Sequence, residues 1–316
     1  MEHLRALERR LAAYLMVEGS PWPLGIFRVI LGASICFDAR ENLKRVNFYT
    51  PDAFHFPYFD FIVPLSPEQL LTLFDWEFTF AVMLLLGLAT PVAAAGVLLT
   101  QGYVLLICQL NFRNHIYLTL LMTLLVMISP AWRVLSVDGL LRWAWFRLKG
   151  EPERAAAPRW VTITTQRLIG LQVSIAYLYA ALHKLNPGFL TGYPLSKALS
   201  KTLPRSYVVR EGYLAPETAQ WLADRVSEPS WSALVAYLTI FSEGFLALGL
   251  LFRSTRLAAV IVGVGLHLSI GLSMDILTFG VLMVGGYVCF WAPRLRPIAV
   301  SGQAPPALEK STEEGR

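Results

Sequence analysis

Two ionisable side chains stand together at the end of an otherwise apolar segment, "YLYAALHKLNPGFLTGY" (residues 177–193). His183 and Lys184 precede Pro187 and Gly188, which are residue types that commonly follow the end of a helix. A lysine amine that is partly removed from water favours its neutral form, which can accept a proton from a substrate. The alternative is a lysine that snorkels to the membrane surface. A helix turns His183 about 100° away from Lys184, which indicates an exposed interfacial histidine.

Other polar residues lie in or beside apolar segments. Asn114 and His115 open one segment, where Asn114 could cap a helix or the pair could orient a ligand. His267 lies inside another segment, where a satisfied structural histidine is the commoner role. Arg28 and Glu243 are expected to pair as buried structural charges, although Arg28 could equally hold an anion.

Aromatic side chains make up 12% of the sequence. Tyr117 and Tyr177 are typical of packing or of the aromatic belt at a membrane surface, and with His267 and Arg28 they are further candidates for lining a ligand site. No Ser-His-Asp order, HExxH, CxxC or phosphate-loop motif occurs. The three cysteines have no metal-ligand spacing, so no metal site is predicted.

The composition indicates that a membrane surrounds these residues. Of the 316 residues, 55% are hydrophobic and only 16% are charged, against about 25% charged in soluble domains. Apolar segments close to the length that a bilayer requires recur along the chain. The formal charge of +5 is carried mainly by loops and ends, where it reports orientation rather than binding to nucleic acid.

The sequence therefore predicts an all-α integral membrane protein, a bundle of about eight transmembrane helices with additional interfacial helices. "SPEQLLTLF", "APETAQWLADRV" and "LSVDGLL" are expected to start helices, the last with Asp138 near its N-terminus. The predicted spans are 22–38, 70–89, 92–110, 115–132, 161–183, 231–252, 257–273 and 276–293.

Three regions are predicted along the chain. Residues 1–20 have leucines at helical spacing among charged residues, which is typical of an amphipathic interfacial helix. Residues 21–295 form the transmembrane domain. Residues 296–316 are polar and are expected to be a disordered cytoplasmic tail.

Basic residues predict the orientation. The 133–159 connection is rich in arginine and lysine, so it is expected to be cytoplasmic, and eight spans then place both termini in the cytoplasm. The 39–69 and 185–230 loops fall outside, with His115 and Lys184 at the same outer face. The 185–230 loop is also basic, which is the main observation against this topology.

Several blocks together carry a resemblance. "FRVILGASICFDAR", "NFRNHIYLTLLMTLL", "LSVDGLLRW", "YLYAALHKLNPGFLTGY" and "HLSIGLSMDILTFG" occur in the order found in vitamin K-dependent γ-carboxylases. The chain also resembles bacterial horizontally transferred transmembrane (HTTM) domain proteins. The resemblance covers roughly residues 22–293.

This resemblance implies a membrane-embedded enzyme whose site opens away from the cytoplasm. It implies that Lys184 is the base that deprotonates reduced vitamin K or a related quinol. Oxygen then converts the quinol to an epoxide, and the strong base so formed removes a glutamate γ-proton before carbon dioxide adds, a lyase-type carboxylation. It also implies that Asn114 and His115 support the quinol and that His267 lines the pocket.

The chain ends about twenty residues after its last predicted span, without the large extracytoplasmic portion of the animal carboxylases. The expected partners are therefore the lipid bilayer of the cell (inner) membrane, a quinone, and a small secreted peptide or a separately encoded substrate-binding protein. The alternative is a non-catalytic HTTM partner in peptide maturation or export, or a transporter.

Overall fold

The computed structural model describes residues 15–156, 158–274, 277–292 and 295–297. Nearly all of its regular structure is helical, which confirms the all-α class. Among the described residues, four helices are long and apolar enough to cross a membrane: α2 (Trp22–Leu43), α3 (Pro67–Leu86), α13 (Pro229–Gly249) and α14 (Arg256–Met274).

The other predicted spans also coincide with helices. Shorter apolar helices are α4 (Thr90–Leu106), α5 (Asn114–Met127) and α15 (Leu277–Gly286), which continues into the 3₁₀ turn η5 (Tyr287–Phe290). The helix α8 (Thr164–Lys184) has 21 residues. Each of the eight predicted segments therefore contains a helix, and the first runs five residues further than its predicted end at 38.

Short elements connect these helices. The connecting helices are α6 (Val137–Leu148), α7 (Pro152–Ala155), α9 (Pro187–Leu190), α10 (Tyr193–Thr202), α11 (Tyr207–Arg210) and α12 (Pro216–Ser227). The 3₁₀ turns are η1 (Val46–Phe48), η2 (Gln109–Asn111), η3 (Pro130–Arg133) and η4 (Leu203–Arg205).

Local sequence sets several helix ends. Ser66 and Gln69 form a capping box at the start of α3, with Pro67 in the first turn. Gly87 ends the same helix with a φ of 66°, the left-handed conformation that glycine adopts without strain. The three predicted helix starts are thus confirmed as α3, α12 and α6.

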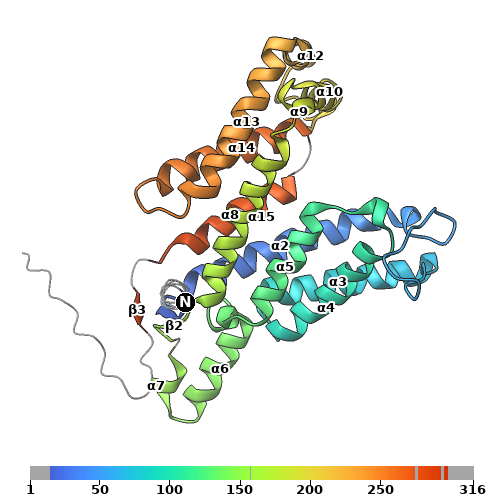
Figure 1. The fold of residues 1–316 in the computed structure, drawn as a ribbon. Coiled ribbons are helices and arrows are strands. Elements are labelled where there is room, and N and C mark those ends of the chain that lie inside the picture. Colours follow the sequence, from blue (N-terminus) through green and yellow to red (C-terminus); the bar gives the residue numbers. More distant parts are fainter. Residues whose placement is uncertain (1–14, 157, 275–276, 293–294, 298–316) are drawn as a thin grey trace, which may run out of the picture.

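The helices form two groups (Figure 1). In the first group α2 packs on α3, α3 on α4 and α4 on α5. In the second group α8 packs on α13 and α13 on α14, and α10 and α12 lie at one end. The α15 helix contacts α2, α8 and α14, so it joins the two groups.

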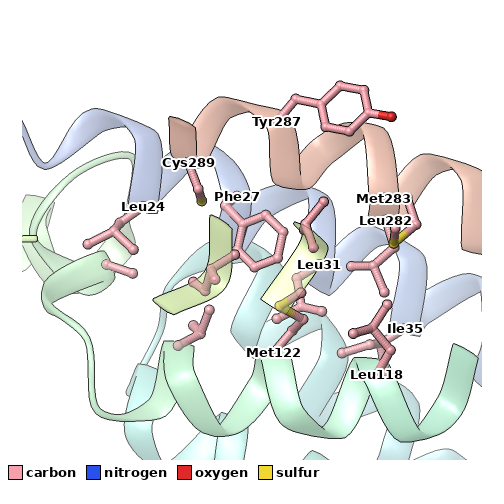
Figure 2. Close-up of a cluster of buried hydrophobic side chains, with 14 of the residues drawn as sticks. Leu24, Phe27, Leu31, Ile35, Leu118, Met122, Leu282, Met283, Tyr287 and Cys289 are labelled. Carbon is pink, nitrogen blue, oxygen red and sulfur yellow. The ribbon is translucent and has the colours of Figure 1, made fainter. Parts of the chain in front are cut away.

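The largest apolar cluster lies where the groups meet. Figure 2 shows Leu31 of α2 and Met122 of α5 facing Leu282 and Met283 of α15. Tyr287 lies on the other side of that ribbon, with its hydroxyl pointing away from these side chains. Burying this cluster fixes α15 against both groups, and the positions of the polar residues on α15 follow from that packing.

A small sheet corrects the prediction for both ends of the chain. The strand β1 (Val17–Gly19) pairs antiparallel with β2 (Val161–Thr162) and with β3 (Arg296–Pro297). The predicted 1–20 helix is therefore wrong for residues 17–19, and the predicted disordered tail is wrong for residues 296–297. Residues 1–14 and 298–316 lie outside the described residues. Strands of two or three residues are too short to show an alternating pattern of apolar and polar residues, so the sequence did not predict this sheet.

Candidate functional site

Lys184 ends α8 and forms an ion pair with α13. Its Nζ atom donates to both carboxylate oxygens of Glu243, each at 2.7 Å. The lysine side chain is 25% exposed and the glutamate side chain 9% exposed. Lys184 thus has an acidic partner on a neighbouring helix, which the sequence did not predict. The expected Arg28–Glu243 pair is also wrong.

Two turns before Lys184 on α8, Tyr177 lies in a buried chain of hydrogen bonds. Its hydroxyl contacts Nε2 of His267 at 2.6 Å and the hydroxyl of Tyr287. Glycine makes this contact possible, because a Cβ at Gly263 of α14 would lie 2.0 Å from the Tyr287 hydroxyl oxygen. Glu243 also acts electrostatically on Tyr177, so the ion pair and this chain adjoin.

Phe279 of α15 connects this cluster to the N-terminal group. Its ring centroid lies 5.8 Å from that of His267 and 6.5 Å from that of His115. His115 is half-buried, whereas Asn114 is exposed. Asn114 does not cap α5, since Arg113 occupies the cap position and no side-chain cap is formed there. The structure thus places both His115 and His267 near one aromatic ring.

Further polar residues lie beside His115. Thr278 hydrogen-bonds the Asp38 carboxyl, and Arg113 and Arg45 lie close enough to act electrostatically on it. Arg113 donates to the Tyr49 hydroxyl at 3.3 Å. Burial raises the pKa of Tyr49, so its phenol stays neutral at alkaline pH that would ionise an exposed tyrosine.

Arg28 occupies a different place and has different partners. Its guanidinium donates to the carbonyls of Leu84 and Leu85 at 2.6 and 2.7 Å, and to that of Leu135. It is fully buried at the C-terminal end of α3, where a positive charge is favourable. It lies ten residues before Asp38 on α2, roughly 15 Å by helical rise. Arg28 therefore satisfies helix ends rather than joining the cluster.

Two other candidates also lie outside the cluster. Tyr117 is 48% exposed and packs against Phe112, about 200° around α5 from His115. His183 is exposed and stacks on Tyr179, as expected for an interfacial histidine. One surface hollow is lined by residues that include Trp22 and Trp291, and another by residues that include Pro204 and Trp221. Neither hollow borders Lys184 or His115.

Sequence reasoning missed two members of the cluster. Glu243 stood out as an ionisable residue in an apolar segment, but nothing local fixes its register against Lys184, 59 residues away. Tyr287 gave no signal, because a tyrosine among apolar residues usually packs. The accompanying Gly263 is one of several glycines in its helix. Within the described residues, no group of His, Cys, Asp and Glu side chains is arranged to hold a metal ion.

The comparison with protein families agrees with this architecture. The HTTM domain matches residues 19–294, most of the chain, so the protein belongs to the HTTM domain family. This domain is found in vitamin K-dependent carboxylase-like proteins. No solved structure matches the chain.

Proposed function

We propose that this protein is a membrane-embedded enzyme of the vitamin K-dependent γ-carboxylase type, which oxidises a reduced quinone at the extracytoplasmic face. Lys184 is the base, and His115 and His267, which both lie near Phe279, are the residues that would hold the quinol. The observation that carries the proposal is the Lys184–Glu243 pair next to the His267–Tyr177–Tyr287 chain of hydrogen bonds on the same helix, α8. Groups with exchangeable protons are rare inside an apolar helical bundle, and where they occur together they usually serve a function.

The ion pair has a direct route to a neutral amine. A proton that moves from Nζ of Lys184 to a Glu243 oxygen 2.7 Å away leaves an amine and a carboxylic acid. The total charge within the membrane does not change, so this exchange avoids the large cost of separating charges there. The neutral amine can then accept a substrate proton.

The residues present fit a quinol. Phe279 offers an aromatic ring near both His115 and His267. Nδ1 of His267 is buried and has no hydrogen-bond partner among the described residues, which leaves it available to a ligand hydroxyl. Asn114 is exposed beside His115, where it would orient the ring. When bound, a reduced quinone would supply electrons to oxygen and so provide the strong base for removing a carbon-bound proton.

The same proposal covers the second substrate and the location. A peptide glutamate would receive carbon dioxide, and the peptide would be small or presented by a separately encoded partner. The protein would lie in the cell (inner) membrane with both termini in the cytoplasm. The basic 133–159 connection supports this orientation.

A non-catalytic role is the alternative. An HTTM partner in peptide maturation or export, or a transporter, would keep the same bundle, with Lys184 and Glu243 as a structural ion pair. The bidentate geometry of that pair is compatible with this role, and turnover distinguishes the two.

The test is quinol epoxidation by purified protein in nanodiscs, with reduced vitamin K and oxygen, and with the epoxide measured by mass spectrometry. We expect epoxide from the wild-type protein and a loss of about 10²- to 10⁴-fold in Lys184→Ala, the usual contribution of a general base. His183→Ala is the matched control, since this neighbour is exposed, and it should retain activity. A wild-type protein that forms no epoxide, with a co-purified quinone also absent, would favour the non-catalytic role.

A further inference from the structure

A second buried acid lies in the N-terminal group, away from Lys184. The buried face of α3 is formed by Leu70, Phe74, Glu77, Ala81 and Leu84, which recur at helical spacing. Glu77 thus occupies a core position between apolar residues, and its side chain is 0% exposed. It lies ten residues into α3, roughly 15 Å from the start of the helix.

Amides rather than cations surround Glu77. The side chains of Gln101 on α4 and Asn42 on α2 face its carboxyl group, and Asp38 is the charged residue that acts on it. The charges of Arg113 and Arg45 act on Asp38 rather than on Glu77. The charge of Glu77 also acts on Tyr49. Among the described residues, no lysine or arginine forms an ion pair with Glu77.

The hydrogen bonding of an ionised Glu77 is incomplete, although the Gln101 and Asn42 amides favour its charged form. Within the described part of the chain, neither Glu77 oxygen has a well-formed hydrogen bond, and Oε1 of Gln101 also has no donor. Gln101 is 1% exposed, so solvent water has almost no access to hydrogen-bond it. An ionised carboxylate in such a place carries a large desolvation cost. A proton on Glu77 removes its charge and gives it a hydroxyl that can donate to Gln101 Oε1.

We propose that Glu77 binds a proton and, with Asp38, forms a proton-exchange site separate from the Lys184 cluster. Asp38, beside Arg113 and Arg45, is the ionised carboxyl group of the site, and Glu77, beside Gln101, is the protonated one. Asp38 accepts a hydrogen bond from Thr278, which is adjacent to Phe279. The site therefore adjoins the aromatic ring that lies near both His115 and His267. This proposal does not depend on quinone chemistry.

The test is infrared spectroscopy of the full-length protein in nanodiscs, which detects the carbonyl stretch of protonated carboxylic acids at neutral pH. We expect a band in the wild-type protein that disappears in Glu77→Gln. Glu68→Gln is the matched control, because Glu68 lies on the same helix in an exposed position, and it should leave the band unchanged. A band that persists in Glu77→Gln would overturn the proposal.

Thermal stability gives a second readout. The glutamine amide resembles a neutral acid in shape, so Glu77→Gln should melt at the wild-type temperature near pH 4, where the carboxyl group is protonated in both the folded and the unfolded protein. As the pH rises above about 4, the unfolded chain loses the Glu77 proton before the folded protein does, so the wild-type protein should become progressively less stable than the variant. If instead wild-type stability rises with sodium concentration and Glu77→Gln abolishes that rise, the site binds a metal cation rather than a proton, and the proposal is wrong.

Discussion

Arg28 and Lys184 are both cations within apolar helices, but the structure satisfies them in different ways. Arg28 is fully buried and donates to three backbone carbonyls, from Leu84, Leu85 and Leu135. Lys184 is partly exposed and bonds to one titratable side chain, Glu243.

Under the proposed function, this difference separates a structural charge from a reactive one. A guanidinium does not give up its proton, and a backbone carbonyl does not accept one, so the Arg28 site is chemically inert. An amine and a carboxylate can exchange a proton within their hydrogen bond. The partners of a buried charge therefore decide its role more than its depth does. The predictions below test this division from the largest expected effect to the smallest.

Removal of the Arg28 charge should destabilise the folded protein without directly affecting the Lys184–Glu243 pair. Arg28→Leu leaves three carbonyls without their donor, and we expect a loss of about 3 kcal/mol or more in unfolding free energy. Chemical denaturation in detergent measures it. Arg253→Leu, at an exposed turn, is the control and should change stability by less than about 0.5 kcal/mol. Equal stability of the two variants would remove the structural role of Arg28.

Packing at Gly263 should position the hydrogen-bonded tyrosines Tyr177 and Tyr287. A Cβ in Gly263→Ala collides with the Tyr287 hydroxyl, and overpacking of this kind costs about 1–3 kcal/mol. Gly265→Ala on the same helix has no atom within 4 Å of the new Cβ and should be neutral or slightly stabilising. Thermal unfolding of the pair measures the difference, and indistinguishable melting curves would contradict the packing argument.

Asp138 should contribute to the stability of the fold at the start of α4. Its carboxylate accepts from the backbone N–H groups of Ala89 and Thr90, so it caps α4 rather than the helix that contains it. Asp138→Asn loses one of these acceptors, and the expected cost is about 1 kcal/mol, as for other helix caps. An unchanged unfolding midpoint in denaturant would show that the cap is dispensable.

Tyr49 should have the smallest effect and a distinct pH dependence. Its raised pKa means that the folded state keeps the phenol proton after the unfolded state has lost it, so wild-type stability falls as pH rises above about 10. Tyr49→Phe should cost about 1 kcal/mol at neutral pH, through the lost hydrogen bond from Arg113, and should make the alkaline fall smaller. Parallel alkaline unfolding curves for the two proteins would contradict this assignment.

Sequence patterns predicted the helices well because apolar length and capping residues act locally. Ser66, Pro67 and Gly87 define α3 without help from the rest of the chain. The same patterns placed Lys184, His115 and His267 in one region only through orientation and resemblance. They could not reveal that Glu243 faces Lys184 or that Gln101 faces Glu77, because these contacts depend on the packing of whole helices. The expected Arg28–Glu243 pair failed for the same reason.

The most direct test of the central claim removes both members of the Lys184–Glu243 pair. Replacing a buried ion pair by apolar residues of similar size is often neutral for stability, so Lys184→Leu combined with Glu243→Leu should fold like the wild-type protein. Epoxide formation in nanodiscs, measured per folded molecule, should nevertheless fall about 10²-fold or more. A folded double variant that forms epoxide at the wild-type rate would show that Lys184 is not the base.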